Sequence, residues 1–175
     1  VTGEAGTGLE NLRQAALKAG ADTVFSASQA AQAEVELAKA GVSSADILHG
    51  ALGGALNLAS AGHLELARAA EISASAMTVF KLSGSDVPHI ADLLAAGANK
   101  SAAEVEDMGA ALQQAGLVAA QTGLTIEDTS AVLAMFAQNG LKGSDAGTSL
   151  KTMLIALNPK SEEAAQTMEG LGLKF

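Results

Sequence analysis

The stretch Gly123-Leu124-Thr125-Ile126-Glu127-Asp128-Thr129 marks the end of one predicted helix and the start of the next. Glycine suits the position just after a helix. Thr125 with Asp128 opens the next helix, and earlier in the chain Ser43, followed three residues later by Asp46, resembles a capping box with Asp in place of Glu. Comparable breaks divide the 175-residue sequence into short helices, and they fall at Gly20, Gly41, Gly62, Gly84, Gly123, Gly140 and Pro159.

Strong helix formers fill the segments between these breaks, with 39 Ala and 23 Leu in the chain. No stretch alternates apolar and polar residues for long enough to predict a strand. The sequence therefore predicts an all-α fold, a compact array of about eight or nine short helices. The approximate bounds of the expected helices are 4–20, 28–40, 46–62, 64–81, 86–97, 102–122, 126–139, 144–157 and 160–169.

The chain also resembles itself. Residues 37–46 line up with residues 136–145, because in both an apolar helix ends at Gly and a cap begins the next helix shortly afterwards. This match suggests duplicated helix-turn-helix units. The alternative is that any Ala-rich helical protein shows such matches.

Composition excludes several functions. The chain has no Cys, so a disulfide framework and a thiolate metal site are excluded. A net charge of -9 with 2% aromatic residues removes the basis for nucleic-acid binding. No apolar run approaches the length of a membrane span, and the N-terminus lacks the features of a signal peptide. Since the sequence starts at Val1, we expect it to be a fragment of a longer chain.

No catalytic, cofactor or metal site is expected. The spacing of His49, His63 and His89 matches no metal motif. Two acidic clusters lie in first helical turns, where the helix dipole favours negative charge, and they comprise Glu104, Glu106 and Asp107, and Glu127 and Asp128. The Gly140–Ser144 loop lacks the residue order of a phosphate-binding loop.

Four glycines are expected to have structural roles in helix ends and helix packing: Gly41, Gly140, Gly143 and Gly147. Gly143 and Gly147 are four residues apart and share a helix face, so we expect them at a close helix contact.

Three stretches resemble the conserved domain of bacteriophage tail tape measure proteins, also called minor tail proteins. They are Phe25–Ala31 with Leu37–Ser43, Asp92–Ser101 with Val105–Leu112, and Gly123–Thr129 with Asn139–Leu150. The resemblance covers about 150 residues. It divides the chain into an N-terminal helix and link, residues 1–24, and the tape measure domain, residues 25–175.

The resemblance implies a structural virion protein and no enzyme. It implies a role in tail assembly, tail length determination and genome ejection, in the tail lumen of the virion and in the host cytoplasm during assembly. Its implied partners are tail tube and baseplate proteins and tail assembly chaperones, with self-association in the lumen left open. It implies no sequence-specific contact with nucleic acid, and contact with a membrane only during ejection.

Two alternatives remain at this point. One is a helical cell-wall hydrolase that uses Glu104 or Glu127. The other is a membrane-active ejection segment built on helices such as residues 46–61, although Asp46, His49 and Asn57 oppose spontaneous insertion.

Overall fold

The predicted helices are present in the computed structural model, which describes residues 6–159 and 161–170 and contains no strand within them. The all-α prediction is confirmed. The elements are α1 (Thr7–Asp22), α2 (Ala27–Lys39), α3 (Ser44–Asp46), η1 (Ile47–Ala51), α4 (Leu52–Gly62), α5 (Leu66–Phe80), η2 (Gly84–Asp86), α6 (Val87–Asn99), α7 (Val105–Gln121), α8 (Ile126–Gln138), α9 (Gly143–Leu157) and α10 (Glu162–Gly170).

The segments α3, η1 and α4 form one continuous helix with a π-helical turn, bent where Gly50 leaves helical geometry. Gly50 has φ 164° and ψ -33°. With this helix counted once, and η2 taken as the first turn of α6, the described residues form nine helices, which agrees with the predicted number.

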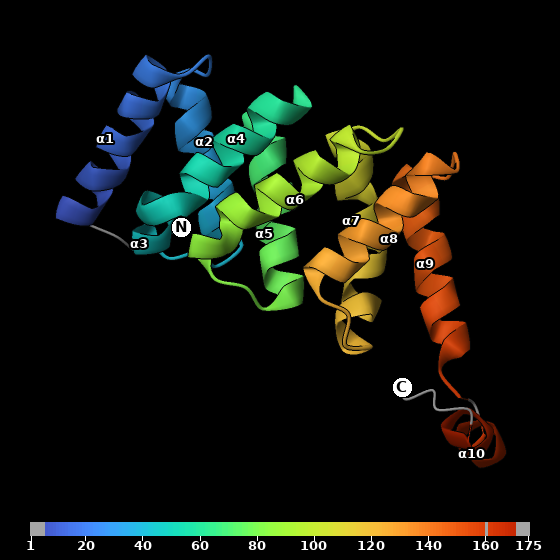
Figure 1. Ribbon diagram of the computed structural model, residues 1–175. Coiled ribbons are helices and arrows are strands. Elements are labelled where there is room, and N and C mark those ends of the chain that lie inside the picture. The colour runs from blue at the N-terminus through green and yellow to red at the C-terminus, as the bar shows by residue number, and fades with distance from the viewer. Residues whose placement is uncertain (1–5, 160, 171–175) are drawn as a thin grey trace.

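The helices form two layers. In the first layer α2, α5, α7 and α9 pack side by side in this order, and in the second α4, α6 and α8 do the same. Figure 1 shows the second layer running across the first. Because the chain alternates between the layers, each turn of the array is a helical hairpin, as in an α-solenoid.

The buried positions of the first layer repeat every 38 or 39 residues. Seven buried positions of α5, from Leu66 to Met77, recur 39 residues later in α7, from Val105 to Gly116. One series of equivalent core residues is Glu34, Ser73, Leu112 and Leu150, and another is Ala30, Ala69, Met108 and Ala146.

The second layer has the same repeat. The buried residues of α6 are Val87, Ile90, Ala91, Leu94 and Ala98, and those of α8, each 39 residues later, are Ile126, Thr129, Ser130, Leu133 and Ala137. Helical hairpins therefore repeat, as the sequence suggested, but this repeat does not relate the two stretches that suggested it. Residues 37–46 join the first layer to the second, whereas residues 136–145 join the second layer to the first, so the two stretches share capping geometry but occupy different places.

Polar contacts also connect neighbouring repeats. Arg68 on α5 holds the Glu106 carboxylate on α7, with Nη2 2.7 Å from Oε1. His89 on α6 contacts Glu127 on α8 at 2.7 Å. Each pair spans 38 residues, one less than the 39-residue repeat that relates these helices.

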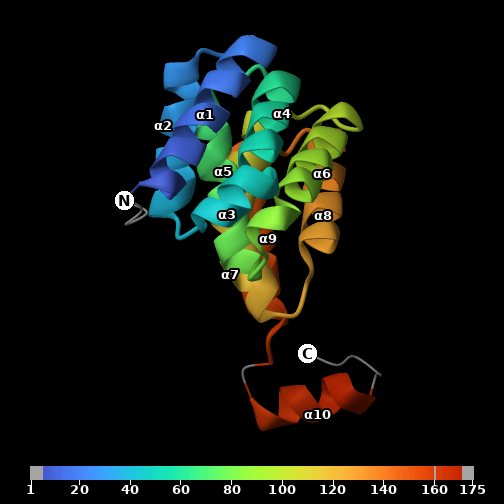
Figure 2. The ribbon, with the colours of Figure 1, turned by 90° about the vertical axis from the view of Figure 1, so that its left-hand side faces the viewer.

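The two ends of the array differ. At one end α1 packs on α2 and η1, and Leu12, Ala16 and Ala19 are buried there. At the other end α9 packs on α7, while α10 lies apart from the array and buries none of its side chains. Figure 2 shows α10 separated from the layers.

Candidate functional site

Two carboxylates of the acidic clusters that the sequence singled out, those of Asp107 and Asp128, serve in helix caps. The backbone N–H of Glu104 donates to Asp107 at 3.0 Å, and the side chain of Asp107 also lies 3.1 Å from Lys142 Nζ. Thr125 and Asp128 form a reciprocal capping box at the start of α8. These carboxylates therefore satisfy helix termini and join α7 to the start of α9.

Glu127, the other carboxylate considered for hydrolysis, is an exposed partner of His89. The hydrogen bond from His89 lowers the pKa of Glu127 below its usual value. A carboxylic acid that acts as a general acid near neutral pH needs a raised pKa. The environment of Glu127 lowers its pKa instead. The geometry gives no support to the hydrolase alternative.

No group of three or more metal-ligating side chains occurs within the described residues. Among the same residues, none of the helices combines the length and the apolar character that crossing a bilayer would require. His63, one of the three histidines, ends α4 in the left-handed conformation with φ 51°.

The four glycines lie at two kinds of place. Gly41 and Gly140 follow the ends of α2 and α8 with φ 89° and 86°, and the next residue's N–H donates back into the helix, from Val42 to Leu37 and from Leu141 to Phe136. Gly143 and Gly147 face α7. A Cβ on Gly143 would lie 3.1 Å from Asp107, and a Cβ on Gly147 would lie 2.7 Å from Gln114 Cβ.

A groove lies between α1 and α2, with a volume of about 480 Å³. We call it the α1/α2 groove. Its lining is mostly apolar and comprises Leu9, Leu12, Arg13, Ala16, Leu17, Ala27, Ser28, Ala31, Glu34, Val35 and Ala38. Leu9, Leu17 and Val35 remain exposed along it.

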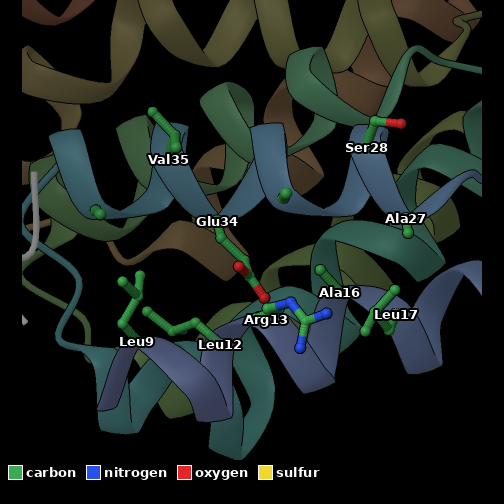
Figure 3. A pocket seen from close by; sticks show the side chains of 11 residues that line it. Leu9, Leu12, Arg13, Ala16, Leu17, Ala27, Ser28, Glu34 and Val35 are labelled. Carbon is green, nitrogen blue, oxygen red and sulfur yellow. The ribbon is translucent and has the colours of Figure 1, made fainter. Parts of the chain in front are cut away.

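Glu34 is the unusual member of this lining. In Figure 3 its side chain extends from α2 toward α1, beside Leu12 and Ala16. Only 7% of Glu34 is exposed, and its Oε1 atom has no hydrogen-bond partner. Burial raises the pKa of Glu34 to about 7. Arg13 lines the same groove, but its guanidinium pairs with Glu10 at 3.0 Å.

Sequence reasoning missed both the groove and Glu34. A detectable signal existed, since the 39-residue register places Glu34 in the same series as Leu112 and Leu150. A charged residue at a core position is a departure from the apolar pattern.

The layers and the groove define a class of protein: a helical repeat array whose features are surfaces for packing. The chain belongs to the phage-related minor tail protein family, whose model matches residues 13–175.

Two relatives support this assignment. The tape measure protein of Pneumococcus phage Dp-1 is 34% identical over 175 residues, which is all of this chain and 15% of the relative. The probable tape measure protein of Escherichia phage P2 is 34% identical over 163 residues, which is 93% of this chain and 20% of the relative. The chain thus spans only a fifth or less of the relatives' length. No solved structure matches it significantly.

Proposed function

We propose that this chain is a folded module of a phage tail tape measure protein, one that acts in tail assembly and genome ejection and contributes little to length measurement. The single observation that carries the second part is the folding of the helices into two layers. The names of the two relatives support the first part.

The argument about length is geometric. Residues 6–159 as one continuous helix would span about 230 Å, at about 1.5 Å per residue. The left-handed residues Gly41, Gly123 and Gly140 instead turn the chain back between layers. The apolar faces then bury against one another, so the helical rise produces a folded body and little contour length.

The partners follow from this proposal. The module would contact tail tube or baseplate proteins in the virion tail and tail assembly chaperones in the host cytoplasm. We further propose that the module is not an enzyme, which is supported by the capping and pairing roles of Glu104, Asp107 and Glu127.

We retain residues 25–175 as the proposed domain, with residues 1–24 as an N-terminal helix and link. The capping box of Ser26 and Gln29, which begins α2, supports a boundary at this place. A chain that starts at Phe25 should keep a cooperative thermal transition and lose only the helix content of α1. A non-cooperative melt would make α1 part of the domain.

The function is tested by two deletions in the parent phage. Removal of residues 25–171 should abolish tails or infectivity. A deletion of equal size in a long helical region with heptad repeats should give viable phage with proportionally shorter tails, measured by electron microscopy. If removal of residues 25–171 instead gives infectious phage whose tails are shorter by the full helical contour, the segment is part of the ruler and the proposal is wrong.

A further inference from the structure

The contact between α5 and α7 shows how neighbouring helices of the first layer pack against each other. Glu106 on the face of α7 that packs on α5 pairs with Arg68. Gly109 lies under Ile72, whose Cδ1 would be 2.7 Å from a Cβ on this glycine. Gly116 lies close to Phe80, whose ring would be 3.4 Å from a Cβ there. Here small residues on one helix accept large apolar side chains from the other.

The face of α2 that is equivalent to this face of α7 is not covered by another described helix. Two repeats before Glu106, Gly109, Gln113 and Gly116, at a constant distance of 78 residues, lie Ser28, Ala31, Val35 and Ala38. All four line the α1/α2 groove. The groove is therefore the next position of the first layer, lined by α1 and α2 and unfilled by any described helix.

The complementary face is open on α9. The residues of α5 that enter α7 include Arg68, Ile72, Val79 and Phe80, and 77 residues later stand Asp145, Ser149, Ala156 and Leu157. These four α9 residues are exposed, as is Met153, at 41%. Figure 1 shows α9 at the opposite end of the array from α1 and α2.

We propose that α9 of a second copy of this chain packs into the α1/α2 groove, so that copies stack head to tail and continue the first layer. The contact extends a layer that already exists within the molecule, since α2 packs on α5, α5 on α7 and α7 on α9, and the buried positions of these helices recur every 38 or 39 residues. The proposal is independent of the proposed tail function, because it rests on the repeat alone.

The polar groups of the two faces are compatible. At the place where Arg68 meets Glu106 within the chain, Asp145 would meet Ser28, whose hydroxyl can donate to a carboxylate. Ser149, in the place of Ile72, brings a hydroxyl to the region of Glu34, whose Oε1 lacks a partner. A buried polar atom without a partner is unfavourable, so the added helix relieves a defect of the free groove.

The two faces of this contact are different, so the interface is heterologous and does not close at two copies. This property gives a sharp test with the 175-residue chain. Ala31→Arg blocks the groove, and Met153→Arg blocks α9; both residues are exposed, so the fold should be kept. Gln32→Arg and Met135→Arg are matched controls at exposed positions outside the two faces.

Sedimentation velocity over a range of concentrations measures the association, and circular dichroism checks the fold of each variant. We expect the wild-type chain and both controls to form growing oligomers. Each blocking variant alone should associate at least about ten-fold more weakly, which is a loss of about 1.4 kcal/mol. An equimolar mixture of the two blocking variants should form dimers and nothing larger, because each variant contributes one intact face.

Three results would overturn the proposal. A wild-type chain that stays monomeric at every concentration means that another helix fills the groove. Blocking variants that associate as strongly as the controls place the contact elsewhere. A mixture of the two blocking variants that stays monomeric, when the wild type associates, shows that α9 does not enter the groove.

Discussion

The backbone carbonyl of Ala111 in α7 lies directly against Gly147 in α9, where any Cβ would collide with it. One repeat earlier, the equivalent glycine Gly109 of α7 lies against the side chain of Ile72 of α5. The absence of a side chain at these two positions sets how closely neighbouring helices of the first layer approach.

Replacement of Gly147 should therefore destabilise the fold. Gly147→Ala places a methyl group against backbone atoms that cannot rotate away, and we expect the free energy of unfolding to fall by about 1–3 kcal/mol. Gly147→Leu should cost more. Urea denaturation of the chain measures both. Gly53 is the control, because it is exposed in α4 with no neighbour within 4 Å of its Cβ position, so Gly53→Ala should stabilise by up to about 1 kcal/mol. If Gly147→Ala is as stable as the wild type, the close contact between Ala111 and Gly147 does not limit the packing of α7 and α9.

Helix boundaries could be predicted because they depend on local signals. Thr125 with Asp128 starts α8, and Ser43 with Asp46 starts the helix after α2, as the sequence indicated. Gly41 and Gly140 end helices because they adopt left-handed φ values, which glycine does at little cost. His63 and Lys81 do the same without being glycine, and no local rule identifies them.

The layers and the groove could not be predicted because they depend on partners distant in sequence. Ala is both the commonest helix former and the commonest buried residue here, so Ala30 and Ala31 look alike, although the first is fully buried and the second lines a groove. What repeats every 39 residues is the pattern of buried positions, more than the residue types at those positions. Gly109 and Gly147 stand where Ala70 and Ala31 stand in the earlier repeats.

Ser130 in α8 offers a test of the second-layer register. Its Oγ is buried without a hydrogen-bond partner, and the equivalent position one repeat earlier is Ala91. Ser130→Ala should therefore raise the free energy of unfolding by about 1 kcal/mol, because the variant no longer buries an unpaired hydroxyl. Thr129 is the neighbouring control, since its hydroxyl donates to the Thr125 carbonyl at 2.7 Å. Thr129→Val should destabilise in the same thermal or urea measurement. A loss of stability in Ser130→Ala would show that its hydroxyl has a partner in solution.

Glu34 should make stability depend on pH. Burial raises its pKa to about 7 in the folded chain from an ordinary value of 4.5, so between these values the folded state binds more protons than the unfolded state. The contribution of Glu34 to stability is therefore present below about pH 4.5 and is lost as the pH rises to about 7. Relative to the wild type, Glu34→Gln should gain about 1–3 kcal/mol between pH 4 and pH 8.

The control for this measurement is Glu36→Gln on the same helix, where the carboxylate pairs with Lys39 at the surface at 2.9 Å. The difference in stability between this variant and the wild type should change little over the same pH range, since an exposed pair contributes about 0–1 kcal/mol. Urea denaturation at several pH values gives both profiles. If Glu34→Gln and the wild type have parallel profiles, Glu34 titrates at its ordinary pKa and the groove is more hydrated than its burial indicates.

The repeat itself can be tested by removing one unit. Deletion of residues 66–104 joins Glu65 to Val105, which occupies the place of Leu66 one repeat later. In the shortened chain α7 would pack on α2 as α5 does, and α8 would pack on α4 as α6 does. In a solenoid each repeat contacts only its neighbours, so the fold should survive the loss of one unit. We expect a helical chain with a cooperative thermal transition at a lower midpoint, because one interface in each layer is lost.

A deletion out of register gives the opposite expectation. Removal of residues 66–85 takes out about half a repeat, so every following helix would change layer and its buried face would meet the wrong neighbours. Cores need complementary volumes as well as apolar residues, so this chain should melt without cooperativity and bind a hydrophobic dye. Circular dichroism and thermal scans of the two deletions distinguish the cases directly. If both shortened chains melt cooperatively, helix amphipathicity alone organises the array and the 39-residue register carries no structural information. If neither folds, the repeats are too dissimilar to replace one another, and the equivalence of α5 with α7 is limited to the pattern of burial.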